Sequence, residues 1–189
     1  MFIIKNKYFL IIENTKDIDL KNIKKKNKFS IIYRNNTGQK SKYDLLKFRK
    51  SCKTKSIKFY VANDLHLALY LNSDGLYLSA SNKSLKFLFI KEKLEIIGSA
   101  HNIKEIVLKK KQGCKFILFS KLYLVDYDKK APFLGIIKFN NFLKLNKNLI
   151  PLGGINIRNL NSLSLINSKG FAIMSELKKK PANIINRLF

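Results

Sequence analysis

The segment Leu149–Leu177 constrains the fold most, because a pair of glycines follows a short apolar stretch and a second apolar stretch comes soon after. Leu149–Leu152 has the length and composition of a strand. Gly153-Gly154 allows a sharp turn in which the backbone can approach a ligand with no Cβ in the way. Apolar residues at helical spacing come next, and we expect Asn156 to be the N-cap of a helix.

The second apolar stretch, Phe171–Met174, predicts another strand, which Ser175 closes. Parallel strands joined by a crossover end at the same edge of one sheet. Gly153-Gly154 and Met174-Ser175 should therefore lie side by side. Free backbone N–H groups at such an edge, with a helix N-terminus behind them, predict an anion site.

Six more stretches of strand length precede this segment, and apolar residues at helical spacing lie between several of them, as over Lys42–Lys53. Strands that are apolar on both sides form parallel sheets covered by helices. The alternation fits an open doubly wound sheet or a closed barrel. The predicted strands are Tyr8–Ile12, Phe29–Tyr33, Ile57–Ala62, Asp74–Leu78, Leu94–Ile97 and Lys115–Phe119.

Residues 1–189 suit a single domain, and a barrel of this length needs shortened helices and loops because typical (βα)8 domains have ~250 residues. The 15 residues from Ser120 to Leu134 form an unusually long loop, which is typical of functional or mobile segments. Near the end of the chain, Pro181 in a first turn predicts a short last helix with Ile185 on its apolar face.

The formal net charge of +26 would attract polyanions. The lysines are scattered, however, and Lys, Asn, Ile, Phe and Leu are abundant together, as an AT-rich coding sequence would produce. No zinc-finger, recognition-helix or RNP pattern accompanies the charge, so no specific nucleic-acid partner is predicted. Cys52 and Cys114 lack metal-site spacing and predict buried reduced thiols in a cytoplasmic protein. Charges interrupt the apolar residues at the start of the chain, which predicts neither a signal peptide nor a membrane span.

The predicted strands and their polar ends follow in a fixed order along almost the whole chain: YFLII, IIYRNN, VANDLHLAL, DGLYLS, IIGSAH, LGGI and GFAIMS. In this order they resemble the strand ends of the thiamine phosphate synthase/TenI family. The resemblance favours the closed barrel over the open sheet: an α/β fold, a single compact (βα)8 TIM barrel. It implies condensation of an aminopyrimidine pyrophosphate with a thiazole phosphate to thiamine phosphate.

The resemblance also implies a site at the mouth of the barrel, with small phosphorylated substrates and Mg²⁺. Asp64 matches a metal-binding carboxylate, and Arg34 matches an arginine whose guanidinium can bind phosphate bidentately. In tautomerases of the TenI type, a histidine at the place of His101 moves protons. The catalytic candidates are His101, Ser99 and Arg34, and the substrate- and phosphate-binding candidates are Asn63, Gly153, Gly154, Met174, Ser175 and Lys129.

The chain departs from the family pattern at the pyrophosphate and metal end. Ile32 and Asn36 replace the Gln and Lys of a Gln-x-Arg-x-Lys motif, and Asn82 stands where a second metal-binding Asp is expected. The family's Pro-Thr-x-Thr-Lys loop reads LVDYDKK, in which only Lys129 or Lys130 could replace the Lys. A thiazole tautomerase and a catalytically silent barrel that binds phosphate or polyanions therefore stay as alternatives to the synthase. A homo-oligomer is also compatible with the sequence.

Overall fold

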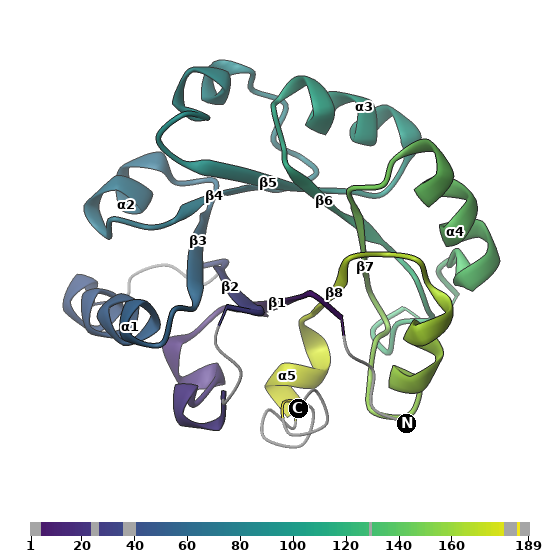
Figure 1. Cartoon of the computed structure of the whole chain (residues 1–189), viewed down its shortest axis with the longest axis horizontal. Coiled ribbons are helices and arrows are strands. Elements are labelled where there is room, and N and C mark those ends of the chain that lie inside the picture. The colour runs from purple at the N-terminus through teal and green to yellow at the C-terminus, as the bar shows by residue number, and fades with distance from the viewer. Residues whose placement is uncertain (1–4, 24–26, 36–40, 129, 180–184, 186–189) are drawn as a thin grey trace.

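A computed structural model describes residues 5–23, 27–35, 41–128, 130–179 and 185. Over this part of the chain, strands and helices alternate around a ring of eight parallel strands, with helices on the outside (Figure 1). The predicted single barrel is confirmed, and all eight predicted strands form. They are β1 (Lys7–Ile12), β2 (Phe29–Tyr33), β3 (Lys58–Ala62), β4 (Gly75–Leu78), β5 (Glu95–Ala100), β6 (Phe116–Ser120), β7 (Leu149–Leu152) and β8 (Gly170–Ile173).

The ring of strand pairs is nearly closed. Pairing runs from β7 through β6, β5, β4, β3, β2 and β1 to β8, always parallel. β7 and β8 lie side by side, but in the described residues they form no ladder with each other. All strand ends that carry the predicted site residues therefore face the same mouth, and β7 and β8 flank the break in the ring.

The alternation of side chains along each strand explains why the strands are apolar on both sides. One set of residues fills the inside of the barrel, and the alternate set packs beneath the helices. Leu10 and Ile31, for example, belong to the outer layer. The inner layer takes side chains from every strand: Phe9, Ile11, Ile32, Tyr60, Tyr77, Ile97, Phe116, Leu118, Ile150 and Ala172.

The helices are short, as the length of the chain predicts. The longest, α1, confirms the helix expected over Lys42–Lys53. In the described part of the chain, the crossovers that lead to β2, β5 and β8 contain only 3₁₀ helices. The α-helices are α1 (Lys42–Thr54), α2 (Leu65–Tyr70), α3 (Ile103–Lys111), α4 (Gly135–Leu145) and α5 (Ser175–Lys179), and the 3₁₀ helices are η1 (Thr15–Asp17), η2 (Leu20–Asn22), η3 (Lys86–Ile90) and η4 (Leu160–Leu165).

The helix predicted after the glycine pair is wrong in type and start. The crossover there is η4, and Asn156 is not its N-cap. The Asn156 carboxamide instead accepts from the N–H of Arg158 at 2.9 Å, and Asn159 Nδ2 donates to the carbonyl of Gly154 at 2.7 Å. Asparagine side chains that satisfy the backbone locally compete with an α-helix, which explains the difference.

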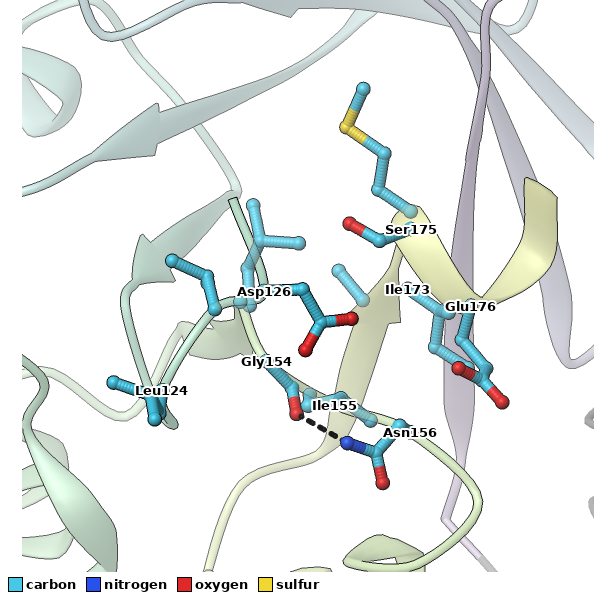
Figure 2. Close-up of a pocket in the computed structure, with 13 residues that line it drawn as sticks. Leu124, Asp126, Gly154, Ile155, Asn156, Ile173, Ser175 and Glu176 are labelled. Atoms are coloured by element: carbon cyan, nitrogen blue, oxygen red, sulfur yellow. Dashed lines mark hydrogen bonds between the residues drawn. The ribbon is translucent and has the colours of Figure 1, made fainter. Parts of the chain in front are cut away.

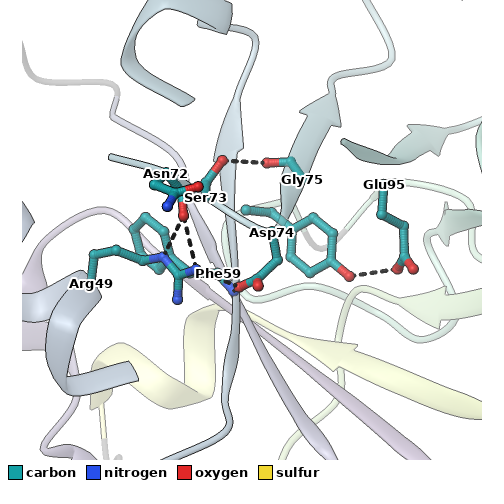
Figure 3. A network of polar contacts seen from close by, with 8 residues as sticks. Arg49, Phe59, Asn72, Ser73, Asp74, Gly75 and Glu95 are labelled. Carbon is teal, nitrogen blue, oxygen red and sulfur yellow. Dashed lines mark hydrogen bonds and ion pairs between the residues drawn. The ribbon is translucent and has the colours of Figure 1, made fainter. Parts of the chain in front are cut away.

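The amino-terminal end of the barrel is held by part-buried polar contacts that join α1 to β3 and to the residues just before β4 (Figure 3). The guanidinium of Arg49 donates to the carbonyl of Asn72 and pairs with Asp74 at 3.3 Å. Asp74 also accepts from the N–H of Phe59 at 2.7 Å. These contacts lie at the opposite end from the mouth, so we assign them to stability.

Both cysteines are free thiols, as predicted; Cys52 is buried and Cys114 is partly buried. Burial raises the pKa of each to about 12, so neither is a reactive thiolate near neutral pH. No helix among the described residues has the length and apolar composition to cross a bilayer. Most of the predicted last helix lies outside the described residues, but Ile185 is described and is fully buried in the core.

Candidate active site at the carboxyl ends of the strands

A pocket lies between the turn after β7 and the start of α5 (Figure 2). Gly153 and Gly154 have φ values of 94° and 70°, which only glycine adopts without strain. The structure thus brings together four of the residues predicted to bind phosphate: Gly153, Gly154, Met174 and Ser175 all line this pocket.

The backbone of the pocket offers hydrogen-bond donors. The carbonyl of Gly154 is occupied, because it accepts from the side chains of Asn156 and Asn159. Among the described residues, no acceptor binds the N–H of Gly154 or Ile155. The first N–H groups of α5, from Ser175 onward, have no partner within the helix because of their position. Together these donors suit a small anion.

The loop after β6 packs directly on the glycine turn. Leu122 N–H donates to the carbonyl of Leu152 at 2.9 Å, and Tyr123 N–H donates to that of Gly153 at 3.0 Å. A Cβ on Gly154 would lie 2.3 Å from the carbonyl oxygen of Leu124. The backbone of this loop therefore approaches Gly154 so closely that the position requires glycine, whereas the sequence pattern predicted a close approach by a ligand.

This loop also places a carboxylate in the pocket. Asp126 lines it, and its side chain points into the space between Gly154 and the start of α5 (Figure 2). The same carboxylate pairs with Lys179 at the end of α5. Lys129, the predicted pyrophosphate ligand, lies outside the described residues. An anion that enters the pocket must therefore displace the Asp126 carboxylate or tolerate it nearby.

His101 and Ser120 meet at the ends of two neighbouring strands. Nδ1 of His101 lies 2.8 Å from Oγ of Ser120, and the His101 N–H donates to the carboxylate of Glu105 at 2.7 Å. Ser120 is aligned with Leu152, a wall of the pocket. Ser120 is not among the site residues predicted from the sequence, although its place at the end of an apolar strand is the signal that identified the other candidates.

Ser99 and Arg34 lie nearer the interior of the barrel. Ser99 is buried and lies close to the phenol of Tyr77. Burial raises the pKa of Tyr77, while the neighbouring Ser99 hydroxyl and the positive charge of Arg34 oppose this rise. Tyr77 therefore stays a neutral hydroxyl between two predicted site residues. Tyr77 was not predicted as a site residue because its position within an apolar strand is typical of a core residue.

Asn63 and Asp64 do not form a metal centre with the residues around them. The carboxylate of Asp64 caps α2 by accepting from the N–H of Leu67 at 2.9 Å. Asn63 bonds through its amide to Ser79 and Asn82 of the loop after β4. In the described part of the chain no group of three or more His, Cys, Asp or Glu could hold a metal ion. Among the described residues at this edge Asp64 is the one carboxylate, whereas Mg²⁺ is usually bound by one or two carboxylates together with substrate phosphates and water.

Comparison with known proteins identifies a family for the sequence of this chain. The family described as thiamine monophosphate synthase matches residues 11–177. The thiamine-phosphate synthase of Clostridioides difficile (strain 630) is 23% identical over 156 residues, covering 77% of this chain and 71% of that protein. That of Prochlorococcus marinus (strain AS9601) is 30% identical over 150 residues, covering 77% and 42%. That of Methanococcus vannielii is 26% identical over 121 residues, covering 63% and 59%. The chain thus spans less than two thirds of the length of two of these three relatives.

Solved structures confirm the fold. Thiamine phosphate pyrophosphorylase from Pyrococcus furiosus superposes with a TM-score of 0.72 at 16% identity, covering 95% of this chain and 96% of that one. KGPDC from Streptococcus mutans superposes with a TM-score of 0.66 at 10% identity, covering 97% and 95%. At these identities the likeness establishes a shared barrel and no shared reaction.

Proposed function

The chain belongs to the thiamine monophosphate synthase family, and from this premise we propose that it binds thiazole phosphate in the pocket between Gly154 and Ser175. The observation that carries the proposal is the set of backbone N–H donors around this pocket, at the edge where barrels commonly place a phosphate. The N–H groups of Gly154, Ile155 and the first turn of α5 would bind the phosphate oxygens. The heterocycle would then extend toward the ends of β5 and β6.

Proton transfer on the thiazole, as in a TenI-like tautomerase, is the reaction that these residues support best. When Nδ1–H of His101 donates to Oγ of Ser120, the lone pair of the neutral imidazole is on Nε2. Within the described part of the chain, Nε2 has no hydrogen-bond partner. His101 is exposed to the mouth, so Nε2 can take a proton from one position of the ring and return it to another.

The synthase reaction is the second candidate, and the family match to thiamine-phosphate synthases favours it. Arg34 would then support a second anionic group, because its guanidinium is a bidentate phosphate ligand. Against this reaction, Asp64 is the one carboxylate that the described residues place at the edge between β3 and β4, because position 82 is an asparagine. Without neutralisation of the leaving pyrophosphate, the condensation loses electrostatic stabilisation of its transition state.

Calorimetric titration separates these candidates. In moderate salt, saturable one-site binding of thiazole phosphate is expected, with turnover of the thiazole tautomer. Formation of pyrophosphate after addition of the pyrimidine pyrophosphate would identify the synthase instead. Salt screens the non-specific attraction between an anion and a highly basic surface. Loss of all binding between low and moderate salt would therefore contradict the pocket assignment.

A further inference from the structure

Lys109, in the last turn of α3, is fully buried. A buried ammonium is costly unless it is well hydrogen-bonded, so its position needs partners. Space for its side chain comes partly from Gly98 on β5, since a Cβ there would lie 2.8 Å from Cδ of Lys109. The side chain runs from the helix layer toward the loop that follows β4.

All three donors of the ammonium are satisfied by uncharged oxygens. Nζ of Lys109 lies 2.6 Å from the carbonyl oxygen of Ser79, 2.8 Å from that of Asn82 and 2.9 Å from Oε1 of Gln112. Gln112 is also buried and donates from Nε2 to the carbonyls of Asn82 and Ser84 at 2.9 and 2.8 Å. The oxygens of the β4 loop therefore converge on a cation that the chain itself supplies.

The amide of Asn63 joins the same loop to the end of β3. Asn82 Nδ2 donates to Oδ1 of Asn63 at 3.1 Å, and the N–H of Ser79 donates to the same oxygen at 3.0 Å. Asn63 Nδ2 in turn donates to Oγ of Ser79 at 3.0 Å. An aspartate at position 82 would instead set a carboxylate against Oδ1 of Asn63, and these acceptors would need a cation between them.

We propose that the Lys109 ammonium and the Asn63–Asn82 amide contact hold the edge between β3 and β4 in place of a divalent cation, so that without a phosphate ligand this edge neither needs nor binds magnesium. The ammonium of Lys109, on α3, binds the loop carbonyls of Ser79 and Asn82. The amide of Asn82 binds Asn63 at the end of β3, so a neutral group stands where the family pattern has a carboxylate. The assignment is independent of which ligand the pocket at Gly154 takes.

Thermal unfolding in magnesium and in EDTA tests the proposal without any assay of activity. The midpoint of the wild-type protein should be the same in both, and titration with Mn²⁺ should show no saturable binding at Asp64 or Asn82. A magnesium-dependent rise in the wild-type midpoint would overturn the proposal. The pocket titration with thiazole phosphate, carried out in EDTA, is a separate measurement, so the two assignments can fail independently.

Asn82→Asp is the informative variant. In EDTA its midpoint should fall, because Asn63 loses a donor and faces a carboxylate, and magnesium should restore the midpoint by joining Asp64 to the new carboxylate. Asn140→Asp is the matched control, since Asn140 also donates from Nδ2, to the carbonyl of Leu165, far from this loop. If Asn82→Asp gains no response to magnesium, the amide pair is not what excludes the ion.

Lys109→Met tests the ammonium. It should speed amide hydrogen exchange in residues 79–84 and lower the unfolding midpoint by several degrees. The exposed neighbour Lys110→Met carries the same change of charge and should alter neither. Unchanged exchange in residues 79–84 would contradict the role of Lys109. If Lys109→Met does not fold, the Asn82→Asp comparison still decides the proposal.

Discussion

Nδ1 of His101 lies 2.8 Å from Oγ of Ser120, and this contact joins the carboxyl ends of β5 and β6 beside the pocket. His101 is exposed, whereas Ser120 is buried at the end of β6, so His101 is the residue of the pair that can be changed with less effect on the fold. The pair therefore offers a direct way to separate proton transfer from ligand binding.

His101→Ala should lower turnover of the thiazole tautomer by about 10²- to 10⁴-fold, since the proposed acid–base group is lost. The affinity for thiazole phosphate and the unfolding midpoint should stay near those of the wild type. Ser120→Ala should leave the base in place but remove its orienting hydroxyl, giving a smaller loss and a shifted pH profile. Unchanged turnover in His101→Ala would remove the tautomerase proposal.

Asp126→Asn should raise the affinity for inorganic phosphate by about three- to tenfold, because a negative charge leaves the pocket and Lys179 loses its partner. Titration calorimetry at fixed ionic strength measures this change. Asp128→Asn is the control: it makes the same change of charge on the same loop, but Asp128 pairs with Lys121 at 3.5 Å and does not line the pocket. An equal rise in both variants would mean that net charge, and not the pocket, attracts the anion.

Gly154→Ala should destabilise the protein by about 2 to 5 kcal/mol, since left-handed strain adds to a Cβ placed 2.3 Å from the carbonyl oxygen of Leu124. Gly135→Ala is a matched control, because Gly135 has a similar φ of 69° but no atom within 4 Å of the added Cβ. It should cost only about 1 to 2 kcal/mol. Urea unfolding of the two variants measures the difference. Equal losses of unfolding free energy in the two variants would show that the loop after β6 leaves room for a Cβ at position 154.

Acid should weaken the fold through Glu95. Burial alone would raise the pKa of this carboxyl, but hydrogen bonds from Lys115, Tyr60 and Lys58 outweigh burial and lower the pKa from about 4.5 to about 2. A lowered folded-state pKa stabilises the protein above pH 4.5, and this contribution is lost as the pH falls from about 4.5 toward 2.

Glu95→Gln tests this dependence. It should cost about 1 to 3 kcal/mol near neutral pH and flatten the fall in the free energy of unfolding between pH 4.5 and 2. The exposed Glu92→Gln should keep the acid dependence of the wild type. If Glu95→Gln keeps it as well, another carboxylate causes the acid sensitivity.

The eight strands could be predicted because each is buried on both sides, which leaves a run of apolar residues that polar residues end. The meeting of Gly153-Gly154 with Met174-Ser175 could be predicted too, since parallel strands end at one edge. The crossover after the glycines could not, because its form depends on asparagine side chains that bond to the backbone.

The remaining features of the site depend on contacts between distant parts of the chain. The sequence marked the loop from Ser120 to Leu134 as unusual by its length, but its packing on Gly154 and the entry of Asp126 into the pocket are tertiary contacts. The burial of Lys109 could not be predicted for the same reason. The chain has 38 lysines and arginines, and the residues next to Lys109 in the sequence do not distinguish it from the exposed ones.

The pocket lies at the break between β7 and β8, so a ligand bound there can affect the stability of the whole barrel. One wall of the pocket, Leu152–Gly154, continues β7, and the other, Ala172–Ser175, runs from the end of β8 to the first residue of α5. A phosphate bound by N–H groups from both walls would act as a staple across the one junction that lacks ladder hydrogen bonds among the described strands. The occupied barrel should therefore resist unfolding and proteolysis better than the empty one.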